Sequence, residues 1–173
     1  MDIKEFDRKL TMPKTGKLLG LSSYQEEIIE HLLNDTQTIN YKTRMGNSTA
    51  VIYYLFLMLL KNENFNVCYI GASEELVNKI KHDFEMYLRY NLKFIEDHNY
   101  LDEGNRITIE CTKSSVTFLT KDRILSGLEF GELVRDFPSG CSKTICENYV
   151  FSSSDEKFIE RKGNTKVQYL LEN

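Results

Sequence analysis

Apolar side chains in the first half of the chain recur at helical spacing in two places. From Tyr24 to Leu33 they lie three or four positions apart, which predicts a helix that is capped by Ser22 or Ser23 and continues to about residue 34. After a short β-prone segment at 36–41, a second helix is predicted at 48–61, containing the run AVIYYLFLMLL. That run has 11 residues, too few to span a membrane, so it indicates a buried helix.

Apolar runs farther along the chain predict strands. The segment FNVCYI at 65–70 predicts a buried strand, and Ser73 can cap a helix that continues to about residue 89. Further strands are predicted at 106–110, 115–119, 132–135 and 148–151, with 166–171 either strand or helix. This order indicates an α/β fold: a three-layer sheet with helices on both faces at 20–173, preceded by a short N-terminal arm at 1–19.

Composition narrows the class of protein. The 173 residues fit one domain, and the net charge of -4 excludes a whole-chain basic field that would draw the protein to nucleic acid, so any such contact must come from local patches. The four cysteines form no C-x-x-C pair, which favours reduced thiols in a cytoplasmic protein over a metal site. The charged N-terminus MDIKEFDRKL lacks the apolar stretch of a signal peptide.

The stretch YKTRMGNSTA at 41–50 joins the first predicted strand to the apolar helix. Ligands in such sheets bind at the carboxyl ends of the strands, where this loop would lie. The usual phosphate-binding loop reads G-x-x-x-x-G-K-[ST], but here Asn47 follows Gly46 at the position of the lysine. The lysine has therefore either been lost or moved elsewhere in the loop.

The chemistry of a phosphate loop favours a moved lysine. Such a loop needs backbone amides near a helix N-terminus, a cation for the phosphates and a hydroxyl for magnesium. Gly46 allows the close approach, and Ser48 or Thr49 offers the hydroxyl. Lys42 offers the cation, with Arg44 as a second. A strand-to-helix turn without any ligand is the alternative.

Residues 21–151 resemble the ATPase domain of phage large terminases, which are relatives of the helicases. LSSYQEEIIEHLL resembles the glutamine-bearing helix that precedes the phosphate loop in that family, and KTRMGNST resembles a variant loop with its lysine at the start. NVCYIGASEELVNKIKHDF resembles the next strand and helix. GLEFGELVRDF resembles the segment that ends in the acidic metal-site strand, and NYVFSSS the strand end that couples hydrolysis to movement.

This resemblance implies a P-loop-like sheet that binds ATP and Mg2+. The nucleotide-binding residues that it implies, which begin with a Tyr-Gln pair at the adenine, are Tyr24, Gln25, Lys42, Arg44, Gly46, Asn47, Ser48 and Thr49. The magnesium ligands that it implies are Ser48 and Asp136. As alternatives, the Tyr24-Gln25 pair fits a partly buried helix face, and Asp136 fits a turn acid at the end of a strand.

Phe137 is the main departure from the family's pattern. An ATPase of this type has a glutamate after the metal-binding acid to orient and deprotonate the attacking water, whereas here Phe137 follows Asp136. The catalytic residue is therefore unassigned. We expect ATP turnover to be orders of magnitude lower than in an ATPase that has this glutamate. No later acidic cluster resembles the two-metal nuclease of a complete terminase.

Basic residues in the arm and near the C-terminus are the candidates for contacts with a phosphate backbone. They are Lys9, Lys14, Lys17, Arg161 and Lys162. The resemblance to terminases, together with the missing glutamate, implies a phage-encoded regulatory or DNA-associated protein. Such a protein would bind double-stranded DNA or a nucleic-acid machine of host transcription or packaging, with little or no hydrolysis. A small active DNA-dependent ATPase and a protein-only interaction module are the alternatives.

Overall fold

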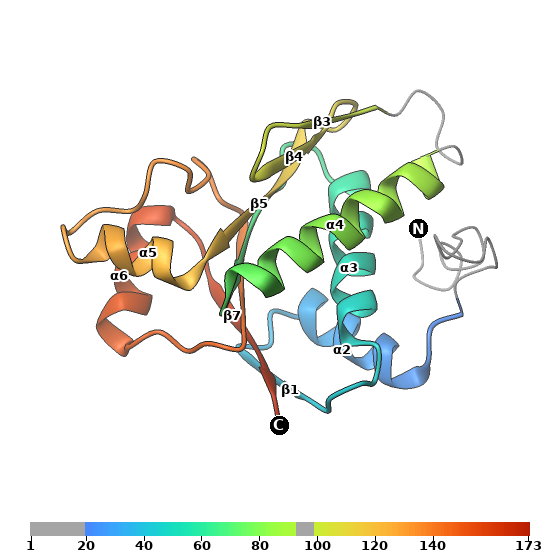
Figure 1. The fold of residues 1–173 in the computed structure, drawn as a ribbon, viewed down its shortest axis with the longest axis horizontal. Helices are drawn as coiled ribbons and strands as arrows, with labels where there is room; N and C mark the ends of the chain where they lie inside the picture. The colour runs from blue at the N-terminus through green and yellow to red at the C-terminus, as the bar shows by residue number, and fades with distance from the viewer. Residues whose placement is uncertain (1–19, 93–98) are drawn as a thin grey trace.

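The computed structural model describes residues 20–92 and 99–173 (Figure 1). The helices in this part are α2 (Ser23–Leu33), α3 (Asn47–Lys61), α4 (Glu74–Asn91), α5 (Lys121–Leu128) and α6 (Ser153–Gly163). The strands are β1 (Thr38–Tyr41), β2 (Asn66–Gly71), β3 (Tyr100–Asp102), β4 (Arg106–Ile109), β5 (Ser114–Thr120), β6 (Lys143–Glu147) and β7 (Val167–Glu172). The predicted arm at 1–19 lies outside the described residues.

One mixed sheet contains all seven of these strands, in the order β1-β7-β6-β2-β5-β4-β3. The first five strands in that order are parallel to one another. Strands β3 and β4 form an antiparallel hairpin, and β4 also pairs antiparallel with β5. Strand β1, which leads into the predicted phosphate loop, therefore lies next to the C-terminal strand β7 and not next to β2.

Helices cover both faces of the sheet, which confirms the three-layer prediction (Figure 1). Successive side chains of a strand point to opposite faces. In β2, Val67 and Tyr69 pack with α2, α3 and α4, whereas Cys68 and Ile70 pack in the second core beneath α5 and α6. A continuous apolar strand such as FNVCYI thus serves two cores at once.

Capping residues set the helix starts in the first half, as the sequence predicts. The Ser22 side chain accepts from the Gln25 amide while the Gln25 side chain accepts from the Ser22 amide, which forms a capping box at α2. Ser73 caps α4 by accepting from the Leu76 amide. The predicted helix at 48–61 is α3, and its ten buried residues account for the continuous apolar run.

Two predicted strands were wrong. Residues 132–135 lie in the loop between α5 and β6, where the Glu132 amide donates to the Gly127 carbonyl oxygen and closes a turn. Residues 148–151 leave the sheet because Asn148 adopts a left-handed conformation with φ of 58° immediately after β6. The ambiguous segment at 166–171 is a strand, β7.

A buried lysine fastens α2 to the sheet. Lys143 at the start of β6 donates from Nζ to the carbonyl oxygen of Leu32, at the C-terminal end of α2, and forms an ion pair of 2.8 Å with Asp35. Burial lowers the pKa of Lys143, while Asp35 opposes this effect. The contact fixes the helix that carries Tyr24 and Gln25 against the strand that ends in Glu147.

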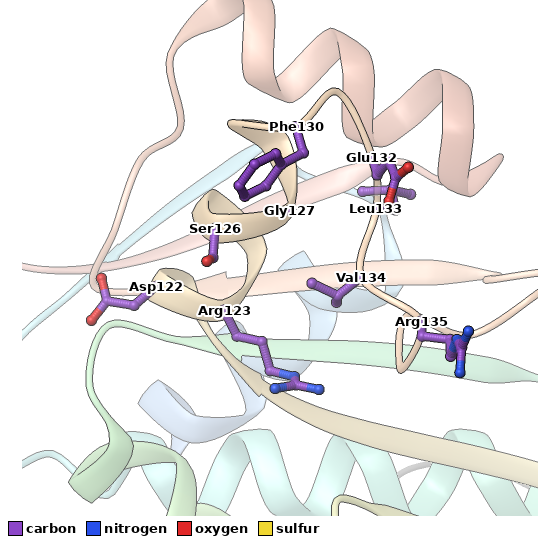
Figure 2. Close-up of a pocket in the computed structure, with 9 residues that line it drawn as sticks. All are labelled: Asp122, Arg123, Ser126, Gly127, Phe130, Glu132, Leu133, Val134 and Arg135. Atoms are coloured by element: carbon purple, nitrogen blue, oxygen red, sulfur yellow. The ribbon is translucent and has the colours of Figure 1, made fainter.

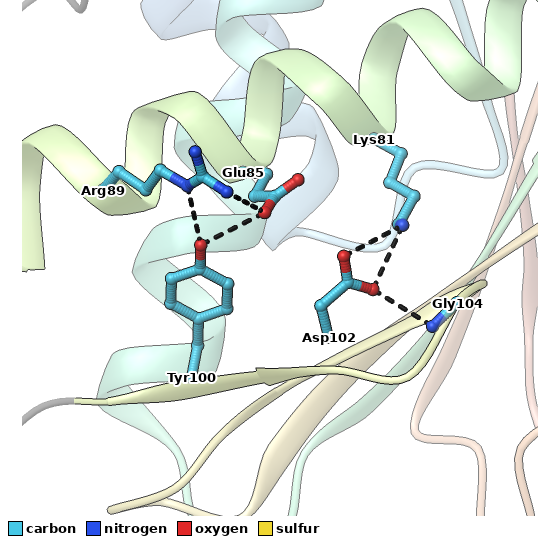
Figure 3. A network of polar contacts seen from close by, with 6 residues as sticks. All are labelled: Lys81, Glu85, Arg89, Tyr100, Asp102 and Gly104. Atoms are coloured by element: carbon cyan, nitrogen blue, oxygen red, sulfur yellow. Dashed lines mark hydrogen bonds and ion pairs between the residues drawn. The ribbon is translucent and has the colours of Figure 1, made fainter.

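Polar contacts join α4 to the β3–β4 hairpin (Figure 3). Arg89 forms an ion pair of 2.8 Å with Glu85 and donates from Nε to the Tyr100 hydroxyl oxygen at 2.9 Å. Lys81 forms an ion pair of 3.1 Å with Asp102. These contacts hold the hairpin at the edge opposite β1. In the part of the chain that the structure describes, no helix combines the length and the apolar character needed to cross a bilayer.

Candidate nucleotide-binding site

The loop at 42–46 turns the chain sharply from β1 into α3. Arg44 and Gly46 adopt left-handed conformations, with φ of 64° and 77°. Asn47 closes the loop by donating from Nδ2 to the Lys42 carbonyl oxygen at 2.7 Å. The first turn of any α-helix leaves amides without intrahelical acceptors, so the start of α3 is suited to an anion.

Tyr24 and Gln25 of α2 hold this loop from the side. Gln25 donates from Nε2 to the Gly46 carbonyl oxygen at 3.0 Å, while its Oε1 accepts from the Ser22 amide at 2.9 Å. The Lys42 amide donates to the Tyr24 hydroxyl oxygen at 2.6 Å. The pair predicted from the sequence therefore contacts the loop backbone; the predicted contact with adenine stays a prediction.

Replacement of Gly46 by alanine should destabilise the protein by about 2 kcal/mol, because the new Cβ adds a contact to an unfavourable left-handed backbone. That Cβ would lie 2.3 Å from Gln25 Nε2. Gly104→Ala is a matched control, since Gly104 also has a positive φ, of 83°, but nothing within 4 Å of the new atom. Urea unfolding of both variants isolates the Gln25 contact; equal losses would contradict it.

A cleft of about 420 Å³ lies beside the loop, at the carboxyl ends of β1, β6 and β7. The predicted residues that line it are Arg44, Gly46, Asn47, Ser48 and Thr49. The lining residues that sequence reasoning missed are Tyr41, Thr43, Leu76, Lys79, Glu147, Asn148 and Glu172. Tyr24, Gln25 and Lys42 are not among the lining residues, so the predicted cation Lys42 touches the site through its backbone contacts to Asn47 and Tyr24.

Glu147, the last residue of β6, provides the carboxylate of the cleft. It is only 3% exposed, and its Oε1 accepts from the Tyr41 hydroxyl at 2.8 Å while its Oε2 accepts from the Tyr69 hydroxyl. Burial, followed by the charge of Glu147, raises the pKa of both tyrosines, which stay protonated donors. The two hydroxyls hold the carboxylate in a fixed position on the α3 side of the sheet.

Asn148 and Glu172 line the cleft and connect its parts through hydrogen bonds. Asn148 Oδ1 accepts from the Glu172 amide at 3.0 Å and from the Tyr41 hydroxyl at 3.3 Å. The Thr43 hydroxyl donates to the Glu172 carboxylate, which ties the loop to the end of β7. The acid and the amide that follow one another at the end of β6 thus face the same space as the loop.

The structure does not bring Asp136 together with Ser48. Asp136 lies in the loop after α5, paired with Arg123, and not at the end of a strand as predicted. Phe137 is buried, and its ring would lie 2.7 Å from a Cβ on Gly163. The prediction failed because 132–135 forms a turn, so the strand that ends in an acid and reaches the cleft is β6.

The loop after α5 borders a different cleft, of about 430 Å³ (Figure 2). Arg123, Phe130 and Arg135 contribute to its lining, and the Phe130 side chain is 79% exposed. Figure 2 shows Phe130 beyond the end of α5, with Arg135 on the part of the loop that leads back toward the sheet. None of the predicted nucleotide-binding residues lines this cleft.

The residues of the cleft beside α3 fit a magnesium–nucleotide group. The Ser48 hydroxyl and the Glu147 carboxylate are oxygen donors of the kind that Mg2+ prefers, and Arg44 and Lys79 bring positive charge for phosphates. Across residues 20–92 and 99–173, no three histidine, cysteine, aspartate or glutamate side chains gather to hold a metal by themselves. Phosphate oxygens and water would therefore complete the shell, as is usual for Mg2+.

The predicted nucleic-acid residues do not lie at this cleft. Arg161 and Lys162 are exposed in the last turn of α6. Lys9, Lys14 and Lys17 lie outside the described residues.

Solved structures of phage proteins superpose on this chain. The large terminase of bacteriophage HK97 superposes with a TM-score of 0.69 at 12% identity, covering 98% of this chain and 36% of that one. The UvsW helicase of bacteriophage T4 gives 0.64 at 15%, covering 98% and 58%. A large terminase from a thermophilic bacteriophage in complex with ADP gives 0.55 at 12%, covering 87% and 39%. No protein-family model and no curated protein matches the sequence.

These likenesses define the fold. The chain has the fold of the terminase-like P-loop ATPase domains, which the sequence motifs predicted. It spans 36% of the length of the HK97 terminase chain.

Proposed function

We propose that this protein binds a magnesium–nucleoside triphosphate beside α3, hydrolyses it slowly or not at all, and serves as a phage-type regulatory or DNA-associated protein. The observation that carries the proposal is the convergence of Ser48, Glu147 and Asn148 on one cleft at the phosphate loop. Ser48 and Glu147 supply oxygen donors to the metal. Asn148 is the reason for which we expect hydrolysis to be slow.

Asn148 follows the acid at the end of β6, the position at which the family pattern has its catalytic glutamate. An amide cannot take a proton from the attacking water, so the step that depends on a general base is impaired. The departure from the ATPase pattern that the sequence located at Phe137 therefore belongs to Asn148. Binding of nucleotide without turnover suits a protein that acts by docking on DNA or on a nucleic-acid machine.

A second candidate is a slow DNA-dependent ATPase. It is favoured by the carboxylate of Glu147, which lines the cleft, is fixed by Tyr41 and Tyr69, and is a group able to accept a proton. Stimulation of phosphate release by duplex DNA would favour this candidate over the regulatory role.

Calorimetry with ATP, in the presence and absence of Mg2+, tests the proposal. The parent should bind ATP in a magnesium-dependent way, and Ser48→Ala should weaken that binding about tenfold or more because a metal ligand is lost. Failure of the folded parent to bind at millimolar ATP would refute the proposal and favour a protein-only interaction module.

Two matched variants locate the phosphate cation. Arg44→Gln should weaken ATP binding more than Lys42→Gln does, since Arg44 lines the cleft and Lys42 does not. The opposite order would return the role to Lys42, as the loop motif predicts.

A further inference from the structure

A second charged cleft, of about 460 Å³, lies at the amino ends of β6 and β7, whereas the phosphate loop lies at the carboxyl ends of the parallel strands. Ser142 and Lys166, which line it, immediately precede β6 and β7, whereas Glu147 and Glu172 end those strands at the nucleotide cleft. Helix α6 contributes Lys157, Arg161 and further residues to the same lining.

The fold brings three cations to this cleft from two segments. Lys157, Arg161 and Asn164 are four and three positions apart, so they share one face of α6 and its cap. Asn164 ends the helix in a left-handed conformation with φ of 48°, which turns the chain back so that Lys166 lies beside α6. Glu160 is the one lining acid, and its Oε1 accepts from the Val167 amide at 3.1 Å.

The three cations are not neutralised by neighbouring acids. Among the residues that the structure describes, no carboxylate lies within 4.0 Å of Lys157, Arg161 or Lys166. Like charges four positions apart on a helix repel each other, so this arrangement costs α6 stability. A concentration of positive charge in a chain of net charge -4 indicates a surface that meets an anion.

We infer that this cleft binds the phosphodiester backbone of a nucleic acid. All seven lining residues are polar or charged, so the cleft offers no apolar anchor of the kind that dominates protein–protein interfaces. The forked guanidinium of Arg161, two lysines and the Ser142 and Asn164 side chains are the donors that phosphates take from proteins. The cleft in Figure 2 differs in that apolar side chains, among them the exposed Phe130, contribute to its lining.

The inference supplies the surface for the nucleic-acid association in the proposed function and rests on that part of it. It is independent of the phosphate loop, because no residue lines both clefts. Nucleotide binding and nucleic-acid binding are therefore separable by mutation.

The test is fluorescence anisotropy with labelled, random-sequence duplex DNA over a range of salt concentrations. The double variant Lys157→Gln/Arg161→Gln should bind about tenfold more weakly, and the slope of log affinity against log salt should fall by about 2, one for each lost phosphate contact. Lys166→Gln, which leaves α6 unchanged, should lower the slope by about 1. The control Lys61→Gln/Arg135→Gln removes the same charge from exposed residues outside the cleft and should behave like the parent.

The outcomes separate the two proposals. If the parent binds duplex DNA and the double variant binds equally well, the cleft assignment is wrong while the proposed function stands. If the parent binds no DNA but binds magnesium ATP, the nucleic-acid role fails together with this inference, and the nucleotide site stands. Polyglutamate serves as a second probe: if its binding, and not DNA binding, is lost in the double variant, the cleft takes an acidic protein segment instead.

Discussion

Replacement of Asn148 by glutamate should raise the rate of ATP hydrolysis by about 10²- to 10⁴-fold, the usual contribution of a positioned general base. Asn148 is exposed in the cleft directly after Glu147, so a longer carboxylate at this position can reach a water molecule near the phosphates. Its left-handed conformation makes the substitution mildly destabilising, but the side chain does not have to enter the core. Phosphate release under saturating magnesium ATP measures the gain.

Asn148→Gln is the control for this gain, because glutamine has the length of glutamate without its basicity. Phe137→Glu tests the position to which the sequence pointed. It should lower the free energy of unfolding without raising turnover, since a buried ring packed against Gly163 would be replaced by a charge. Equal phosphate release by Asn148→Glu and Asn148→Gln would show that Asn148 does not occupy the position of the base.

The free energy of unfolding should fall steeply above about pH 10. Burial is the largest of the effects that raise the pKa of four tyrosines, Tyr41, Tyr54, Tyr69 and Tyr169. It also raises the pKa of Cys146, to about 12. A group whose pKa is raised in the folded state stabilises the protein below its unfolded pKa, and this stability is lost as the pH rises above that value. By pH 11, the contribution of each of the four tyrosines to the free energy of unfolding should have fallen by about 1.4 kcal/mol. The four losses together are comparable with the whole stability of many domains.

Urea unfolding as a function of pH checks this expectation. Tyr54→Phe should flatten the alkaline slope by about 1.4 kcal/mol per pH unit, because it removes one of the four groups. Its cost at neutral pH should be small, since the buried Tyr54 hydroxyl has no hydrogen-bond partner in the described structure. The exposed Tyr90 provides the control variant Tyr90→Phe. Stability that stays constant up to pH 11 in the parent would contradict the burial of these hydroxyls.

Periodicity was sufficient for the elements of the first half. The predicted segments at 36–41, 48–61 and 65–70 correspond to β1, α3 and β2, because their apolar patterning is clear, and the capping serines Ser22 and Ser73 mark the starts of α2 and α4. The position of the loop between β1 and α3 and the α/β class followed from the same segments, whereas the contacts of Tyr24 and Gln25 with the loop backbone were not predicted.

The second half was harder because its central strand is built from polar residues. Lys143, Thr144 and Glu147 are buried in β6, and their side chains bond to residues distant in sequence: Leu32, Thr165 and Tyr69 respectively. No local pattern distinguishes such a strand from a loop. The short apolar pair within 132–135 was a better local match to a strand, yet this segment lies in a loop. The signals that could have located β6 are the capping residues Thr120 and Ser152. They mark the starts of α5 and α6, and β6 lies between these two helices.

The placement of β7 between β1 and β6 sets an order for assembly on the ribosome. Thr38 pairs with Tyr169, so β1 has no neighbour in the sheet until the segment that forms β7 has left the exit tunnel. Strands β2, β5 and β6 can pair beforehand, since all three precede β7 in synthesis. Contacts between segments so distant in sequence form slowly. The wall of the nucleotide cleft that Glu172 contributes is therefore absent until β7 joins the sheet, although Tyr24 and Gln25 can hold the phosphate loop before then.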